Sequence, residues 1–269
     1  MVEWIDSHCH LDGYQKKGEL DAVLERAEQF GVRQMIAIGT DLKDWALNRE
    51  LARAHARRIY YTVGLHPCYV GENWQTTVRQ LESFFQQSNP PVALGEIGLD
   101  YFHLPKESDA ASALKSTQRD AFKWQLSLAQ QIDCPIVIHS RNAFDDTVAL
   151  IDESGVNWQG VVMHCFSYSA EQIKVLAQRG GRASFTGIVT YKNAPKVQKA
   201  LLEQGSDKLM IETDCPYLTP EPHRGTANEP AFVSHIGQRC AELLAIDVET
   251  LATRVAQTTR KFFQIDPID

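Results

Sequence analysis

Short apolar runs separated by amphipathic segments dominate the hydrophobic pattern of this chain. Eight such runs stand out, at residues 2–7, 33–39, 59–65, 92–98, 135–140, 160–166, 182–187 and 208–214. Nearly continuous apolar runs of this length are typical of strands that are buried on both faces of a parallel sheet. The pattern therefore predicts eight buried strands.

Helical periodicity fills the gaps between these runs. In residues 20–30, Leu20, Val23, Leu24 and Ala27 recur at helical spacing, and a glycine follows as a stop signal. The other predicted helices are 44–57, 76–87, 116–132, 143–153, 169–179, 194–204, 229–244 and 248–263.

Strand and helix alternate eight times, which predicts an α/β fold with a single (β/α)8 TIM barrel over residues 1–269. The competing arrangement is a doubly wound open sheet, but its G-x-G-x-x-G fingerprint does not follow the first strand. Two connectors are unusually long, at 100–115 and 217–228. Both follow strands, so they lie on the C-terminal side, where barrel active sites form.

Composition narrows the class of protein. The chain has 269 residues, of which 43% are hydrophobic and 23% are charged, so a large core is expected and disorder is not. No stretch approaches the ~18 consecutive apolar residues of a membrane span, and the N-terminus lacks the pattern of a secretory signal. The six cysteines have no C-x-x-C spacing, which argues against a disulfide framework and predicts a reducing, cytoplasmic location.

With a net charge of −7, the chain lacks the overall basic field of a protein that coats duplex DNA. An anionic substrate would therefore be held by a local site, and bound metal ions could supply the positive charge that it needs.

Histidines and carboxylates collect at the ends of the predicted strands. His8 and His10 are two positions apart at the end of the first strand, so both imidazoles point the same way. The carboxyl ends of the barrel strands meet at one mouth. Histidines and carboxylates that gather there share one function, which is to bind divalent cations. The residues that this rule brings together are His8, His10, His66, Glu96, His139, His164 and Asp214.

The number of candidate ligands predicts two metal ions, because six ligands exceed what one tetrahedral ion needs. Glu96 is the best-placed bridge, since a carboxylate can join two cations about 3.5–4 Å apart. The first ion is assigned to His8, His10, Glu96 and Asp214, and the second to Glu96, His139 and His164. Asp214 would also accept the proton of the attacking water.

Other polar residues receive weaker assignments. His66 is a packing residue, a support for the ligands or a substrate contact. Glu212 shares a face with Asp214 one layer below it and is expected to be structural. His103 is a weak substrate contact, and His55 and His235 are expected to be ordinary.

Together these motifs resemble the TatD family of metal-dependent deoxyribonucleases. The resemblance covers nearly the whole chain, in the family's order. It is carried by the segments at 6–11, 64–67, 95–100, 139–141, 164–167 and 212–218, and by Pro222-His223-Arg224-Gly225 with Asn228 and Pro230. It implies a TIM-barrel hydrolase of the amidohydrolase superfamily with a two-metal site, and the family's ligands fall on the same six positions, both N-terminal histidines included.

The resemblance also implies deoxyribonuclease activity, often 3′→5′ on single strands, so DNA strand ends are the expected partner. Arg141 and Arg224 could bind phosphate oxygens, assisted by Lys192 and Asn193. Aromatic residues on the mouth side could stack on a base, and these are Tyr101, Phe102, Tyr191 and Tyr217.

Two alternatives remain open at this point. One is a hydrolase of another ester or amide on the same barrel, such as a D-aminoacyl-tRNA deacylase or a cyclic amidohydrolase. The other is a non-catalytic protein that binds metal or nucleic acid. Histidine-rich ligation allows Zn²⁺, while phosphoryl chemistry allows Mg²⁺ or Mn²⁺. A monomer is the favoured oligomeric state.

Overall fold

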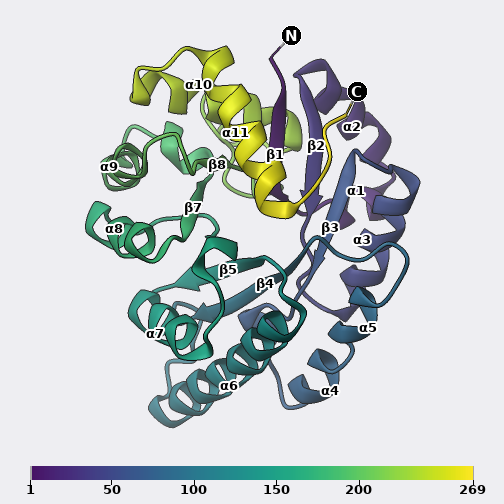
Figure 1. Cartoon of the computed structure of the whole chain (residues 1–269), viewed down its shortest axis with the longest axis vertical. Helices are drawn as coiled ribbons and strands as arrows, with labels where there is room; N and C mark the ends of the chain where they lie inside the picture. The colour runs from purple at the N-terminus through teal and green to yellow at the C-terminus, as the bar shows by residue number, and fades with distance from the viewer. Residues whose placement is uncertain (1, 269) are drawn as a thin grey trace.

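The computed structural model describes residues 2–268 and has eight parallel strands, each paired with the next along the chain (Figure 1). Helices surround the strands, so the predicted (β/α)8 barrel is confirmed. The strands are β1 (Trp4–Cys9), β2 (Val32–Ala37), β3 (Ile59–Val63), β4 (Ala93–Asp100), β5 (Ile136–Arg141), β6 (Val161–Met163), β7 (Arg182–Phe185) and β8 (Met210–Ile211).

Backbone contacts join the last strand to the first. The amide of Asp214 donates to the carbonyl of His8 at 2.9 Å, and the amide of His10 donates to the carbonyl of Cys215 at 3.0 Å. The segment after β8 therefore lies directly beside the end of β1, although the two are about 200 positions apart in the sequence.

The described helices follow the predicted alternation. They are α1 (Asp12–Lys17), α2 (Leu20–Gln29), α3 (Leu42–Ala54), α4 (Trp74–Val78), α5 (Leu81–Phe85), α6 (Ser108–Ile132), α7 (Phe144–Ser154), α8 (Ala170–Arg179), α9 (Pro195–Gln204), α10 (Val233–Leu244) and α11 (Val248–Phe263). Short 3-10 turns lie at η1 (Pro67–Tyr69), η2 (Trp158–Gly160), η3 (Gly187–Thr190) and η4 (Pro230–Phe232).

Apolar side chains fill two layers. The larger layer lies between strands and helices, and a smaller cluster joins strand residues such as Ile36, Val137 and Met210 to Phe262 and Phe263 at the end of α11. Filled barrels of this kind are packed cores rather than pores. The polar residues at the C-terminal strand ends therefore lie directly above a packed apolar core.

Several predicted helices differ from the structure in their bounds. Residues 76–87 form two short helices, α4 and α5, because the amide of Gln80 bonds to the carbonyl of Thr77 and tightens the chain between them. Helix α6 begins at Ser108 rather than at 116, so half of the predicted connector at 100–115 is helical. The alanines and leucine at 110–114 favour this extension.

Helix α3 also begins earlier than predicted, because Asp41 and Asp44 form a capping box at its N-terminus. Among residues 2–268, no helix combines the length and the apolar character that crossing a membrane requires.

Candidate metal centre

His8 is a buried imidazole with no hydrogen-bond partner. It is the fifth residue of β1, is fully buried, and neither ring nitrogen makes a hydrogen bond to any residue within 2–268. Its Nε2 lies 3.4 Å from Glu96 Oε2 and 3.5 Å from Asp214 Oδ1. Buried polar nitrogens are rarely left unpaired, so this one, which faces two carboxylates, fits a metal ion held between them.

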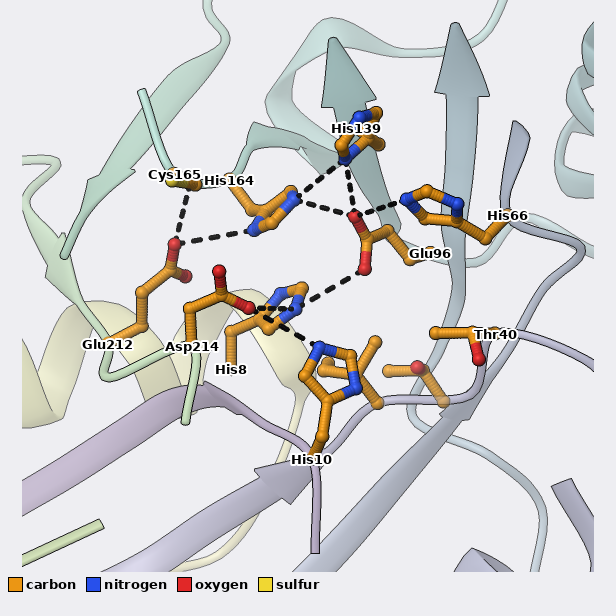
Figure 2. A network of polar contacts seen from close by, with 12 residues as sticks. His8, His10, Thr40, His66, Glu96, His139, His164, Cys165, Glu212 and Asp214 are labelled. Atoms are coloured by element: carbon orange, nitrogen blue, oxygen red, sulfur yellow. Dashed lines mark hydrogen bonds and ion pairs between the residues drawn. The ribbon is translucent and has the colours of Figure 1, made fainter. Parts of the chain in front are cut away.

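Glu96 lies at the middle of the histidine cluster (Figure 2). It comes from the buried strand β4, and its Oε1 lies 2.7 Å from both His139 Nδ1 and His164 Nε2. His66 Nε2 approaches the same oxygen at 3.3 Å, whereas Oε2 faces His8. The two oxygens of one carboxylate thus face two different sets of imidazoles, as a carboxylate bridging two cations requires.

Asp214 lies opposite Glu96, just beyond β8. Its backbone has φ of 55°, a left-handed conformation that is uncommon outside glycine and often found at functional sites. Asp6 holds this turn in place, because its buried carboxylate accepts a 2.9 Å hydrogen bond from the amide of Thr213. The Asp214 Oδ1 lies 3.3 Å from His10 Nε2, so it faces the first pair of histidines.

The structure therefore brings together all six residues for which the sequence predicts a ligand role, although that role stays a prediction. Three overlapping groups each place one ligand atom per residue within 4.8 Å of the others. The groups are His8, His164 and Asp214; His8, His10 and Glu96; and His66, Glu96 and His139. His66, for which the sequence leaves several roles open, thus has a position suitable for a metal ligand.

Two further carboxylates lie behind the histidines. Asp100 Oδ2 is 3.2 Å from His139 Nε2, the ring nitrogen opposite the one that faces Glu96. Glu212 Oε1 is 3.5 Å from His164 Nδ1 and accepts a 2.6 Å bond from the amide of Cys165. Carboxylates in this position orient metal-binding imidazoles and fix their tautomers.

Sequence reasoning assigned Glu212 a structural role and missed Asp100. Spacing could have identified both residues. Asp100 ends the same strand as Glu96, and Glu212 lies two residues before Asp214, so in a regular strand the two side chains of each pair share a face.

Protons on some of the histidines supply positive charge in the metal-free protein, whereas burial lowers the pKa of His8 and of His66. Burial lowers the pKa of His10, but Asp214 outweighs burial and raises that pKa to about 9. For His164, burial again lowers the pKa, and Glu96 and Glu212 raise it well above its usual value. The reverse holds for Glu96, whose pKa burial raises and the surrounding histidines lower well below the ordinary value. The carboxylates of the cluster therefore stabilise positive charge placed among them.

This balance predicts proton release when a divalent ion binds. The pKa of His10 is about 9 when folded and about 6.5 when unfolded, so its charge stabilises the metal-free fold fully below pH 6.5. That stability is lost as the pH rises through 9, and a metal ion must displace the proton. We expect metal affinity to rise over this window, with protons released at pH 7.5. Calorimetry in two buffers of different ionisation enthalpy measures this, and identical heats would contradict it.

Two arginines for which the sequence predicts phosphate contacts lie exposed near the mouth. The guanidinium of Arg141, at the end of β5, stacks 3.9 Å from the ring centre of Phe102. Arg224 stacks 4.2 Å from the ring centre of Tyr191 and lies 3.8 Å from the carboxylate of Glu221. Both guanidinium groups keep N–H donors available to a ligand.

Asn193 and its neighbour Lys192 are exposed just after η3, on the same side of the barrel. Their predicted contact with substrate remains a prediction.

Exposure separates the mouth aromatics into two kinds. Tyr101 is tied down, because its hydroxyl donates to Asp146 at 2.7 Å. Tyr191 is held by a 3.0 Å bond to the carbonyl of Thr219. Phe102 and Tyr217 are 56% and 64% exposed, so both offer ring surface to a base, although Arg141 covers part of the Phe102 ring. Tyr69 is 58% exposed beside His66, and sequence reasoning missed it.

Comparison with known proteins identifies the family. A family model described as TatD related DNase matches residues 5–264. The chain belongs to this family. The Bacillus subtilis protein YabD, named a metal-dependent hydrolase, is 34% identical over 261 residues, which is 97% of this chain and 99% of YabD.

Two further comparisons extend the TatD assignment. A Pantoea ananatis protein named a 3′-5′ ssDNA/RNA exonuclease is 29% identical over 96% of this chain and 98% of its own length. The crystal structure of YjjV, a TatD homologue from Escherichia coli, superimposes on this chain with a TM-score of 0.89 over 98% of this chain and 99% of YjjV. The two sequences are 27% identical. The protein is thus a metal-dependent hydrolase of the TatD family with a TIM-barrel fold.

Proposed function

We propose that this protein is a two-metal phosphodiesterase that removes nucleotides from the 3′ end of single-stranded DNA. One observation carries the proposal: Oε1 of Glu96 faces His66, His139 and His164, whereas Oε2 faces His8. A pair of divalent ions bound there would lower the pKa of a water molecule and neutralise charge on a phosphoryl group.

The chain's own residues suit the remaining tasks. The side chain of Asp214 is 14% exposed, whereas that of Glu96 is only 3% exposed, so Asp214 is the carboxylate that solvent reaches more easily. The imidazole of His10 lowers the pKa of Asp214 against the effect of burial and keeps it ionised. An ionised and accessible carboxylate can accept the proton of the attacking water, as a general base must.

Substrate contacts would come from the exposed rim. Arg141 and Arg224 can each bind phosphate oxygens through two N–H donors. The exposed rings of Phe102, Tyr217 and Tyr69 can stack on unpaired bases, which a duplex does not offer. The name of the Pantoea relative supports a single-stranded substrate and 3′→5′ polarity.

The test is an assay on single-stranded DNA labelled at the 3′ or the 5′ end, with closed circular single strands as a matched substrate. We expect mononucleotides released from the 3′ end, dependence on added metal and no cleavage of circles. Equal cleavage of circular and linear strands would contradict exonuclease action. Hydrolysis of a D-aminoacyl-tRNA or a cyclic amide without hydrolysis of DNA would replace the proposal with another activity on the same barrel.

Arg224→Ala is expected to raise KM for DNA about 10- to 100-fold with kcat nearly unchanged, because a lost charge-assisted hydrogen bond is worth about 1.5–3 kcal/mol. Steady-state kinetics on a short oligonucleotide measure this. Arg239→Ala is the matched control, since Arg239 lies on α10 and pairs with Glu242. A change in thermal stability without a change in KM would make Arg224 structural.

A further inference from the structure

Three residues of different chemistry meet on the rim beside the histidine cluster. Cys68 lies in η1, Asp100 ends β4, and His103 belongs to the connector that leads to α6. The Cys68 Sγ is 3.6 Å from Asp100 Oδ2 and 3.8 Å from His103 Nδ1, and His103 Nδ1 is 2.7 Å from Asp100 Oδ2. All three ligand atoms thus lie within 4.8 Å of one another.

Asp100 is the fixed member of this group. It is 1% exposed, and its Oδ1 accepts 2.9 Å hydrogen bonds from the amides of both Phe102 and His103. These bonds hold the carboxylate rigidly, and Oδ2 faces Cys68 and His103 on the rim and His139 on the inner side. Both of those residues are exposed, so an ion could reach the group from solvent.

We propose that Cys68, Asp100 and His103 form a further divalent-cation site of the zinc class, separate from the centre around Glu96. Zinc takes thiolate, imidazole and carboxylate ligands in a tetrahedron, with bonds of about 2.0–2.3 Å that separate neighbouring ligand atoms by about 3.3–3.6 Å. The two distances to Cys68 Sγ already lie close to that range. Only Oδ2 of Asp100 and Nδ1 of His103, which are hydrogen-bonded, must move apart, by roughly half an ångström. A water molecule would complete the tetrahedron.

Ligand type sets this site apart from the main centre. The groups around Glu96 offer only imidazoles and carboxylates, whereas the rim site adds a thiol, which favours Zn²⁺ over Mg²⁺ or Mn²⁺. Binding displaces the Cys68 thiol proton to solvent, and Nδ1 of His103 must give up the proton that it donates to Asp100, by transfer to Nε2 or to solvent, before it can bind the ion.

One imidazole connects the two sites. His139 faces Glu96 Oε1 through Nδ1 at 2.7 Å and Asp100 Oδ2 through Nε2 at 3.2 Å. An ion on the rim would share Asp100 with His139, so it would alter the partner that orients this histidine.

Cobalt provides a direct test, because Co²⁺ replaces Zn²⁺ and a thiolate ligand adds an intense near-ultraviolet charge-transfer band that imidazoles and carboxylates do not produce. Metal-stripped protein is titrated with Co²⁺, and the bound metal is counted by elemental analysis. We expect the band in the wild type, with one more ion per chain than in Cys68→Ser. The band should be absent in Cys68→Ser and strongly weakened in His103→Gln.

The matched control is Cys134→Ser, a half-buried cysteine in the segment that leads into the N-terminal end of β5, away from the mouth, which should keep the full band. No band in the wild type, a band that persists in Cys68→Ser, or a full band in His103→Gln would overturn the proposal. The result is independent of the proposed function, because the band reports thiolate ligation whether or not DNA is cleaved.

Discussion

Glu96→Ala is expected to abolish hydrolysis, with a loss of turnover on the order of 10³-fold or more, and to lower the amount of bound metal. The reason is geometric. Among residues 2–268, Glu96 is the carboxylate of the cluster that contacts histidines through both oxygens, His8 through Oε2 and three others through Oε1. Without it, the cluster loses the negative charge that would hold two cations close together.

The measurement combines turnover on single-stranded DNA with elemental analysis of the purified variant. Glu96→Gln keeps the shape of the side chain and loses its charge, so it separates a charge effect from a packing effect. Glu72→Ala, at an exposed position, serves as the control. Turnover and metal content both at wild-type level in Glu96→Ala would remove Glu96 from the mechanism.

Asp214→Asn is expected to lower kcat by about 10²–10⁴-fold, the usual contribution of a positioned general base. The amide oxygen of asparagine can still face His8 and His10, but the amide cannot take up a proton from water at neutral pH. Bound metal and the fold should therefore change much less than the rate.

Single-turnover kinetics and metal analysis on the same sample separate these effects, and circular dichroism checks the fold. A loss of bound metal as large as that in Glu96→Ala would make Asp214 a ligand without a separate role as base. A kcat within a fewfold of the wild type would exclude the proton transfer altogether.

The barrel and the gathering of histidines and carboxylates at its mouth could be predicted because both follow from strand periodicity. Eight apolar runs specify eight buried strands, and parallel strands in a barrel deliver their carboxyl ends to one mouth. His8 and His10 share a face because they are two residues apart. Glu96, His139 and Asp214 could therefore be placed together without knowledge of any long-range contact.

The remaining features depend on contacts that periodicity does not encode. The break between α4 and α5 results from one short-range hydrogen bond, at Gln80, that the sequence pattern does not mark. The role of Asp100 depends on His139 and Cys68, which lie on other elements, although its position on the strand of Glu96 marks it as a candidate. The different exposure of Tyr101 and Phe102, which are neighbours in sequence, depends on the position of Asp146 on α7.

The most direct measurement is anomalous diffraction from crystals soaked in Mn²⁺. Our account predicts two anomalous peaks about 3.5–4 Å apart, one on each side of the Glu96 carboxylate. One peak should lie against His8, His10 and Asp214, and the other against His139 and His164. A single peak, or none within bonding distance of Glu96 in fully soaked crystals, would contradict the account.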